Sequence, residues 1–554
     1  MHHEPVTAAK PNPALVTRDA ARRMPRLALL LLCAAYVLPG LAGRDPWRGA
    51  DLSAFGQMLA MAEGRTPWLA PALGGVPTEG ALLSHWIGAA SIALTSPWLD
   101  AAFAARLPFA LLLVLTLVAV WYASFHLART EAAQPLAFAF GGEADVVDYA
   151  RAIADGALLA LIASLGLLQL GHETTPELAQ LAAVACALWA LAAAPYRKQT
   201  SRIVALVAWP ALAASGAPAM ALALGLGALL VATRSRDAAM RAFWPWIVGA
   251  TLLAALVAVP LHAWRWRADS NVDLRLLLRL LAWFLWPAWL LGLWTLWRWR
   301  AYLDRRHIAV PLVSVLVALA ACIVMAGSER ALMLALPGLA PLAAFALPTL
   351  RRSAASAIDW FSVFFFTLCA LTIWVVYVSL NTGVPAQPAA NVMRLAPGFV
   401  VHFSPVELIL AVIATLAWGL LVRWRTGRHR AAIWKSLVLP AGGVVLCWLL
   451  LMTLWLPLLD YARSYRPLIA RIGALMPSGA CVAAPGATTS LVAALEFHAR
   501  RRVDATAQSA TGTCPVLVMV QKAGESVTAP AGWTELARER RPTDRTELTL
   551  VYKR

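Results

Sequence analysis

The stretch RRMPRLALLLLCAAYVLPGLAG, residues 22–43, decides the class of this protein. Three arginines precede an apolar run that fills residues 27–43. A helix needs roughly 20 apolar residues to cross about 30 Å of hydrocarbon, so this run predicts a membrane span. Basic residues beside a first span tend to stay in the cytoplasm, which predicts a cytoplasmic N-terminus, residues 1–26. The run has no small-residue cleavage site, and we therefore interpret it as an anchor and not as a signal peptide.

The composition of the whole chain supports the same class. Of its 554 residues, 60% are hydrophobic and 14% are charged, and the mean hydropathy is +0.67. A soluble protein of this length carries roughly a quarter of charged residues, and disorder requires low hydrophobicity, so both classes are excluded. The net charge of +18 lies in short arginine clusters between apolar runs. Such clusters are typical of topology signals and not of a nucleic-acid-binding face.

The chain contains about thirteen apolar runs of span length, all between residues 27 and 459. The predicted first outside loop, residues 44–100, is too polar and too rich in proline and glycine for a clean span. Its amphipathic piece 52–62 indicates an interfacial helix. Residues 80–94 fit either a second interfacial helix or a true span. Placing them at the interface leaves every later basic cluster on the cytoplasmic side.

The C-terminal segment, residues 460–554, changes to a mixed polar sequence with short β-rich runs at 515–521 and 547–552. Its length of about 90 residues suits a small α/β domain, which the topology places outside. Cys481 and Cys514 fall in this segment, and an even pair in an oxidising compartment predicts a disulfide. Two unpaired thiols are the alternative. The other five cysteines lie in predicted spans, where cysteine behaves as a small hydrophobe.

The candidate chemistry lies in carboxylates next to the bilayer on the outside face. The sequence contains no P-loop, HExxH or CxxC motif. Carboxylates stand instead at the mouths of apolar helices, at Asp51, Glu79, Glu173 and Glu177. Asp51 stands where a helix should begin, so an N-cap is its alternative role. Ionisable groups near membrane depth are costly, and several of them on separate loops therefore indicate a site.

Arginines on the outside face supply the second half of this site. The positive-inside tendency should deplete them there, yet five fall in outside loops or at their edges: Arg265, Arg267, Arg275, Arg330 and Arg394. Guanidinium groups bind phosphate in a bidentate manner. The arginines therefore predict a groove for an anionic lipid head group. Ordinary binding of phospholipids without chemistry is the alternative.

Together, the first-loop carboxylate, the spans and the outside tail resemble the GT-C glycosyltransferases. The likeness is greatest to the ArnT/PMT-like branch, which uses polyprenyl-phosphate sugars. In that branch the first loop carries an Asp-Glu pair that opens a helix, with an aromatic residue four positions on. Asp51 and Phe55 match the first and last of these positions, and Leu52 replaces the Glu.

Three further motifs carry the resemblance. The family's Glu-Lys-Pro-Pro-Leu and Tyr-Trp-Leu-like elements are matched by Glu79, Leu83, His85, Trp86 and Ile87, with Gly80 in place of the Lys. The segment HETTPE, residues 172–177, is similar to an Ala-Thr-Thr/Pro-Asp element. Glu177 is the preferred match in it and Glu173 a close rival. Residues 328–341, which include Arg330, are similar to a Ser-Lys-Arg…Leu-Pro-x-x-Pro element.

The resemblance implies an all-α polytopic membrane enzyme with the GT-C fold and a small C-terminal α/β domain. Residues 27–459 would form the catalytic domain and residues 460–554 the periplasmic domain. The implied reaction moves a monosaccharide from a polyprenyl (undecaprenyl) phosphate to a lipid A-like lipid, a glycan or a protein, with inversion. It would take place at the periplasmic face of the bacterial inner membrane. The expected partners are this donor, its acceptor and membrane lipids, and the enzyme is expected to be a monomer.

The resemblance also suggests roles for the candidate residues. Asp51 would act as the base or as its orienting partner, with Glu79, Glu173 and Glu177 as further catalytic candidates. The candidate ligands of phosphate or substrate are Arg330, Arg267, Arg48, Arg394, Arg265, His85 and His172. No cofactor is implied. No set of ligands is spaced tightly enough to indicate a metal, although paired carboxylates leave a divalent cation open.

A polytopic transporter or lipid flippase is the main rival class, because it also has many spans and buried charges. Two features argue against it: the sequence has no inverted repeat, and its charged residues gather at one face and not midway through the spans. A scaffold protein whose outside domain captures a partner is a third class. It predicts activity in residues 460–554 alone, whereas the enzyme requires the first loop.

Overall fold

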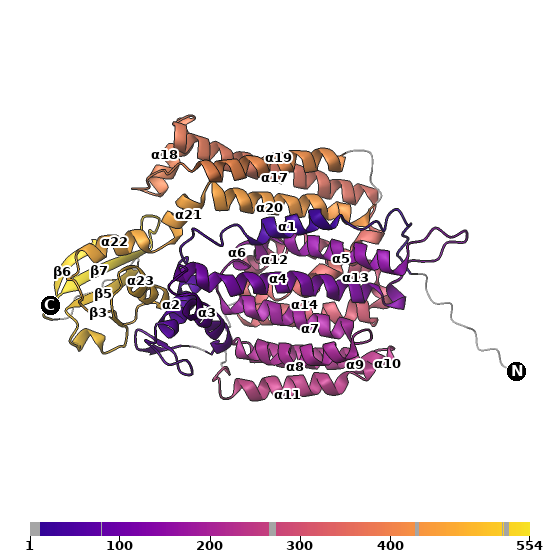
Figure 1. Cartoon of the computed structure of the whole chain (residues 1–554), viewed down its shortest axis with the longest axis horizontal. Helices are drawn as coiled ribbons and strands as arrows, with labels where there is room; N and C mark the ends of the chain where they lie inside the picture. Colours follow the sequence, from indigo (N-terminus) through magenta and orange to yellow (C-terminus); the bar gives the residue numbers. More distant parts are fainter. Residues whose placement is uncertain (1–11, 79, 265–272, 427–431, 523–524, 526–530) are drawn as a thin grey trace.

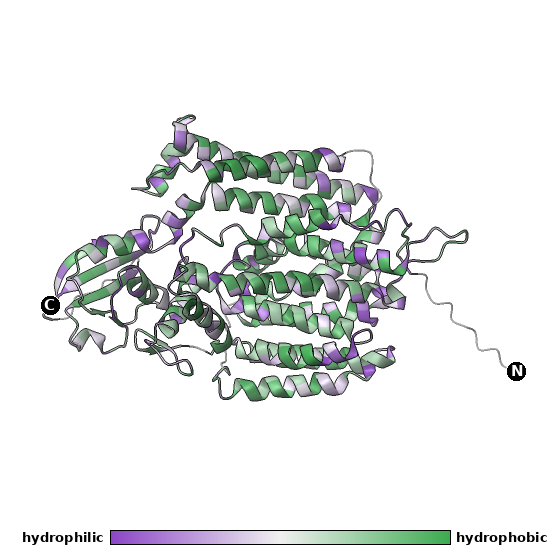
Figure 2. Cartoon of the chain, in the orientation of Figure 1, coloured by the Kyte–Doolittle hydropathy of each residue, from purple (hydrophilic) through white to green (hydrophobic). Residues whose placement is uncertain are grey.

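The structure is a computed structural model of the chain, and it describes residues 12–78, 80–264, 273–426, 432–522, 525 and 531–554. Long helices lie side by side in one bundle, and a small α/β domain sits at one end of it (Figure 1). Apolar residues run along the bundle helices, and hydrophilic residues gather at the end of the bundle away from the α/β domain (Figure 2). This separation is what a polytopic membrane protein requires.

Seven helices of the described chain are long and apolar enough to cross a membrane. They are α4 (Ala101–Ala128), α7 (Pro176–Ala193), α10 with α11 (Ala238–Ala258), α14 (Arg306–Val324), α17 (Arg352–Thr382), α19 (Pro405–Thr426) and η4 with α20 (Ile433–Thr453). An eighth span is formed if α12 (Leu274–Phe284) and α13 (Ala288–Arg298), which are bent by 90°, count as one. The multi-pass helical class predicted from the sequence is confirmed.

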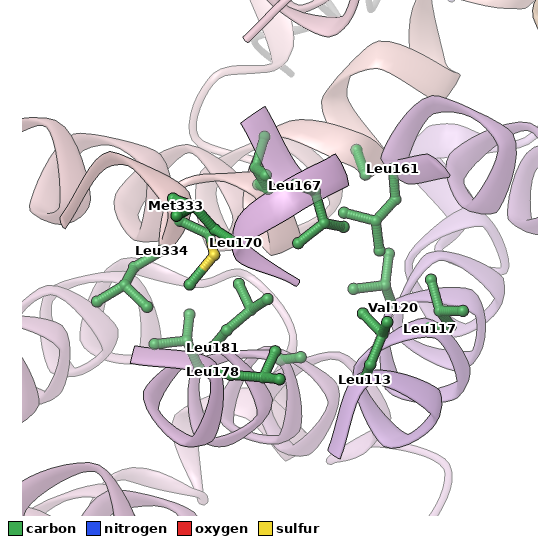
Figure 3. Packing of buried hydrophobic residues seen from close by; sticks show 14 of the residues in the cluster. Leu113, Leu117, Val120, Leu161, Leu167, Leu170, Leu178, Leu181, Met333 and Leu334 are labelled. Carbon is green, nitrogen blue, oxygen red and sulfur yellow. The ribbon is translucent and has the colours of Figure 1, made fainter. Parts of the chain in front are cut away.

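The remaining helices of the bundle are shorter or more polar than a membrane span requires. For this reason the described chain has fewer helices of span length than the sequence has apolar runs. These remaining helices are α1 (Arg26–Val37), α5 (Val146–Ala163), α6 (Leu165–Leu170), α8 (Lys198–Ala214), α9 (Pro218–Arg234), α15 (Glu329–Met333), α16 (Leu336–Ala346), α18 (Ala386–Leu395) and α21 (Leu456–Arg463). Among them, α5 carries Asp148, Arg151 and Asp155, so its composition is too charged for a simple apolar span. Leucines of α4, α5, α6 and α7 belong to one packed core, in which α6 and α7 contact α15 (Figure 3).

The predicted first outside loop, residues 44–100, contains α2 (Ala50–Ala62), α3 (Leu82–Thr95) and a two-stranded hairpin of β1 (Ala72–Leu73) and β2 (Val76–Pro77). Both helices lie between the bundle and the α/β domain (Figure 1). At about 1.5 Å per residue, α3 is roughly 21 Å long, which is short of the hydrocarbon thickness. Its length favours the interfacial interpretation of residues 80–94 over a span. The helix α2 is buried on nearly all sides, with Leu52, Phe55 and Met58 among its fully buried residues.

The C-terminal domain is built on a five-stranded sheet in the order β4-β3-β5-β7-β6. The strands are β3 (Val482–Ala483), β4 (Val503–Asp504), β5 (Val516–Lys522), β6 (Thr534–Glu539) and β7 (Glu547–Lys553), with helices α22 (Arg466–Ala474) and α23 (Thr489–His498). The pairs of β3 are parallel and those of β7 antiparallel. The strands β5 and β7 coincide with the two β-rich runs of the sequence. A disulfide joins Cys481 to Cys514.

The segment that follows α4 pairs with the chain before α1. A β-bridge joins Thr17 to Glu143, and backbone hydrogen bonds run from Ala144 N to Val16 O (3.0 Å) and from Leu136 N to Ala14 O (3.1 Å). The pairing satisfies backbone groups that an isolated loop would leave to water. It fastens the N-terminal segment to the end of the bundle away from the α/β domain.

Candidate active site

Asp51 joins two loops that are distant in sequence. It is the second residue of α2, and it is 2% exposed. Its Oδ1 accepts hydrogen bonds from the backbone N–H (2.7 Å) and the hydroxyl (2.9 Å) of Thr174, while Oδ2 accepts from Trp47 N–H (3.1 Å). Gly49, with φ of 90°, occupies the N-cap position, and no side chain caps the helix. The N-cap interpretation of Asp51 is therefore wrong, because its carboxylate is used between loops and not within α2.

Arg330 gathers both glutamates of the second loop. It lies on α15, and its Nη2 donates to Glu173 Oε2 at 2.5 Å. Its Nη1 donates to Thr175 Oγ1 at 3.1 Å and lies 3.5 Å from Glu177 Oε2. Glu173 is the more buried of the two glutamates, and its Oε1 accepts from Gln169 Nε2 at 2.9 Å. The structure thus brings Glu173, Glu177 and Arg330 together next to Thr174, which binds Asp51.

The turn between α6 and α7 places these groups, and its sequence explains how. Pro176 occupies the first turn of α7, where its missing N–H costs nothing, and Thr175 before it is extended. Below the turn, Leu167 and Leu170 of α6 and Leu178 and Leu181 of α7 pack against α15 (Figure 3). This apolar packing positions residues 172–177 at the end of the bundle.

The two central carboxylates have opposite electrostatic environments. Burial alone would raise the pKa of Asp51, but the charges of Arg44 and Arg106 and the backbone donors of Thr174 and Trp47 bring that pKa below its ordinary value. Burial raises the pKa of Glu173, and the negative charge of Asp51 raises it further against the opposing charge of Arg330. Carboxylates whose pKa values are pushed apart in this way mark candidate acid–base pairs.

Sequence reasoning missed two buried arginines beside Asp51. The side chain of Arg44 is fully buried, and its Nη2 lies 3.5 Å from Asp51 Oδ2 and donates to His172 O at 2.8 Å. Within the described chain, no hydrogen-bond partner faces Arg44 Nε or Nη1. Arg106 is buried near the start of α4, where its Nη1 approaches Leu41 O at 3.4 Å. The sequence could have indicated Arg106 as a functional residue, because an arginine inside an apolar span is rare.

Two hollows flank α12 beside this cluster. One, of about 570 Å³, lies between α6 and α12, and its polar lining residues are Gln169, Arg279 and Glu329. Gln169 binds Glu173, and Glu329 precedes Arg330, so this hollow adjoins the carboxylates. The other, of about 500 Å³, lies on the opposite face of α12 against α13, α14 and α16, with an apolar lining. A chamber with three polar residues in a mainly apolar lining and a wholly apolar groove therefore share one helix.

The remaining predicted residues lie elsewhere. Glu79, Arg265 and Arg267 lie outside the described residues. Arg48 is half exposed and pairs with Asp544 of the α/β domain at 2.9 Å, and Arg394 lies exposed on α18 with Asn391 at 3.2 Å. His85 is buried on α3. The ring nitrogens of His172 face the carbonyl oxygens of Tyr36 (2.8 Å) and Leu168 (2.7 Å). None of the four described residues contacts Arg330.

Metal ligation has no ready site in the part of the chain that the structure describes. No group of three or more histidine, cysteine, aspartate or glutamate side chains there is placed to hold an ion. The acidic groups of the cluster face arginine guanidinium groups instead. Arg279 lines the hollow between α6 and α12, whereas both Nη atoms of Arg330 are engaged by Glu173 and Thr175.

Two crystal structures of one known protein share this architecture. ArnT from Cupriavidus metallidurans bound to undecaprenyl phosphate matches with a TM-score of 0.61 and 14% identity, over 95% of this chain and 97% of that chain. ArnT in the apo state matches with a TM-score of 0.62 and 15% identity, over 95% and 96%. No protein-family model and no curated protein matches the sequence. The chain therefore has the ArnT-like GT-C fold of a polytopic membrane protein.

Proposed function

We propose that this protein is a glycosyltransferase that moves a monosaccharide from a polyprenyl-phosphate donor to an acceptor hydroxyl. Since a fold hosts many functions, the proposal depends on the site. The observation that carries it is the cluster of the buried carboxylates Asp51 and Glu173 with the partly exposed Arg330, beside the chamber that Arg279 lines and across α12 from an apolar groove. The related ArnT structure is bound to undecaprenyl phosphate, which supports a lipid of this kind as the donor's carrier.

The chemistry assigns a different task to each side chain. The donor already has a phosphate leaving group, so the enzyme must align the acceptor, remove its proton and stabilise the departing anion. Glu173 suits proton removal, since a raised pKa brings a carboxylate closer to neutral pH. Asp51, whose pKa is lowered, remains anionic and orients the loop that carries Glu173. Direct displacement at the anomeric carbon inverts its configuration.

The phosphate would be held by arginines at the edge of the chamber. Arg279 lines the chamber from α12, and Arg330, whose Nη atoms bind Glu173 and Thr175, would exchange one of these partners for the phosphate. Forked guanidinium groups suit phosphate better than a point charge does. The apolar groove on the other face of α12 would take the first isoprene units of the carrier. The acceptor is a lipid A-like lipid, a glycan or a protein.

We place the protein in a bacterial inner membrane with its N-terminus cytoplasmic and its C-terminal domain periplasmic. Arginines support this orientation at the end of the bundle away from that domain, where α4 ends before Arg129, α8 begins after Arg197 and α9 ends at Arg234. The disulfide of the α/β domain suits an oxidising compartment. In this proposal residues 1–26 are cytoplasmic, residues 27–459 form the catalytic domain with loop 44–100 outside, and residues 460–554 are the periplasmic domain.

The experiment that tests this function uses the purified full-length protein in lipid nanodiscs. A panel of polyprenyl-phosphate sugars is offered together with lipid, glycan and peptide acceptors, and free polyprenyl phosphate is measured. Release that requires an acceptor, and that Asp51→Asn abolishes, is the expected result. Movement of the intact donor between leaflets without any release would instead support the rival flippase and overturn the proposal.

A further inference from the structure

Residues 460–466, which join the last span to the α/β domain, form hydrogen bonds and an ion pair with the first outside loop. Asp460 Oδ2 accepts from the backbone N–H of Asp45 at 3.1 Å, and the Ser464 hydroxyl donates to Asp45 Oδ2 at 2.8 Å. Arg466 pairs with the other oxygen of Asp45. The backbone N–H of Arg48 donates to the carbonyl oxygen of Arg463 at 3.0 Å. Residues 460–466 thus contact residues 45–48, which directly precede α2.

Trp47 is the central residue of this contact. Its indole Nε1 donates to Asp460 Oδ1 at 2.7 Å, and its ring is 3% exposed. The guanidinium groups of Arg44 and Arg463 lie 4.6 and 4.8 Å from the ring centroid. A cation held over the face of an indole is attracted to the ring, and more strongly in a desolvated place than in water. Asp460 thereby fixes an aromatic ring against the arginine that faces Asp51.

The same residue also reaches the site through its backbone. The N–H of Trp47 donates to Asp51 Oδ2 at 3.1 Å, so the orientation of Trp47 and that of the Asp51 carboxylate are linked. A ring that turned away from Asp460 would move this N–H group. It would also release Arg44, whose Nε and Nη1 have no hydrogen-bond partner among the described residues, from its place between Trp47 and Asp51.

The α/β domain does not need Asp460 in order to dock. Arg65 near the end of α2 pairs with Glu496 of α23, and the hydroxyls of Ser53 and Thr489 bond at 2.9 Å. At Gly56 the backbones come so close that an added Cβ would lie 2.4 Å from the Cβ of Ala493. Both side-chain oxygens of Asp460, in contrast, bind the loop before α2. Its contacts therefore serve that loop and not the general attachment of the domain.

We propose that Asp460 is a positioning residue that sets the Asp51 carboxylate and Arg44 through the Trp47 ring, so that α21, the helix that joins the last span to the α/β domain, organises the transfer site. This inference rests on the proposed transferase function. It assigns the joining segment a task in catalysis although Asp460 does not line the chamber. A defect in positioning should lower turnover more than it weakens binding of the donor.

The kinetic test compares Asp460→Ala and Asp460→Asn with Trp47→Phe. The last variant keeps an aromatic ring but loses the indole N–H. Asp460→Ala should lower kcat by up to about 100-fold with an unchanged KM for the donor. Asp460→Asn, whose amide oxygen still accepts from the indole, should retain more activity. The effects of Asp460→Ala and Trp47→Phe should be non-additive in the double variant, because they remove the same bond. Additive effects, or a KM that rises with kcat unchanged, would overturn the proposal.

Glu496→Gln is the matched control for Asp460→Asn. Each substitution removes one negative charge from a carboxylate that contacts the first loop, but Glu496 binds Arg65 at the far end of α2. Glu496→Gln should leave kcat unchanged. If it lowers kcat as much as Asp460→Asn does at an equal change in Tm, the role of Asp460 is only structural and the positioning proposal fails.

Hydrogen exchange gives a readout that needs no turnover. In Asp460→Ala, peptides over residues 44–52 and 171–178 should take up deuterium faster than in the wild type, because the amides of Trp47 and Thr174 lose the fixed Asp51 acceptor. Glu496→Gln should leave both peptides unchanged. Unchanged uptake in Asp460→Ala would overturn the proposal. If the wild type released no polyprenyl phosphate from any donor, the transferase function would fail while this measurement still decided whether Asp460 holds the loop.

Discussion

Thr174 gives both its backbone N–H and its hydroxyl to one oxygen of Asp51, at 2.7 and 2.9 Å, across 123 residues of sequence. Two donors on one oxygen hold a carboxylate in a single orientation and favour its charged form. Glu173, the residue before Thr174, accepts a hydrogen bond from Arg330 through its carboxylate. The relationship therefore connects the first outside loop to the arginine that we expect to bind phosphate.

Asp51→Asn should leave the protein folded and inserted but lower turnover by about 100-fold or more. An asparagine amide cannot accept at both positions, so it would set an NH₂ group against the donors of Thr174 or Trp47 and leave Arg44 without its counter-charge. Release of polyprenyl phosphate is measured on protein shown to be monodisperse by gel filtration. Near-normal turnover in this variant would remove Asp51 from the mechanism.

Glu173→Gln should reduce activity more than Glu177→Gln. Glu173 is the more buried glutamate and binds both Arg330 and Gln169, whereas Glu177 reaches only Arg330 at 3.5 Å among these partners. The two substitutions are chemically identical and lie four residues apart, so each is the control for the other. The opposite order of kcat values would make Glu177 the functional residue, as the family motif suggests.

The pH dependence of activity should report on Glu173. Because its pKa is raised, it still holds a proton where an ordinary glutamate has lost it, and activity should increase as rising pH removes that proton. The same shift means that its contribution to stability is greatest at low pH and declines as pH rises through the folded-state pKa. A kcat profile of the wild type against Glu173→Gln checks this: the variant should lose the acidic limb. An identical limb in both would assign it to another group.

Arg330→Ala should weaken donor binding more than acceptor binding. The substitution removes the fork that faces Glu173 and Thr175 beside the chamber. Arg330→Lys, which keeps the charge and loses the fork, should lie between the alanine variant and the wild type. The KM values for donor and acceptor are measured separately, and equal changes in both would contradict a phosphate role.

Filling the apolar groove should discriminate between donors by carrier length. Leu316→Trp places a larger side chain at a half-exposed position of the groove, so the KM for a long polyprenyl donor should rise several-fold and that for a short one should not. Leu256→Trp, on the exposed face of α11 outside the groove, is the matched control. If both donors or both variants respond alike, the groove does not hold the carrier.

The sequence by itself determined the membrane class, the helical architecture and the polar C-terminal tail. These depend on hydropathy and charge over stretches of about 20 residues, which are local properties. It also identified Asp51, Glu173, Glu177 and Arg330 as unusual, because carboxylates and arginines at the mouths of outside helices stand against the local trend. The fold assignment from motifs agrees with the ArnT structures at only 14% and 15% identity.

Only the tertiary structure decided what these residues bind. Residue order allowed Asp51 to cap α2, yet packing of the α6–α7 turn on α15 supplied Thr174 as a better partner. Arg44 and the Trp47–Asp460 contact were invisible in sequence for the same reason, since partners 413 residues apart meet only when the last span returns to the first loop. A hydrogen bond acts over about 3 Å, so its choice of partner belongs to the folded chain and not to any one segment of it.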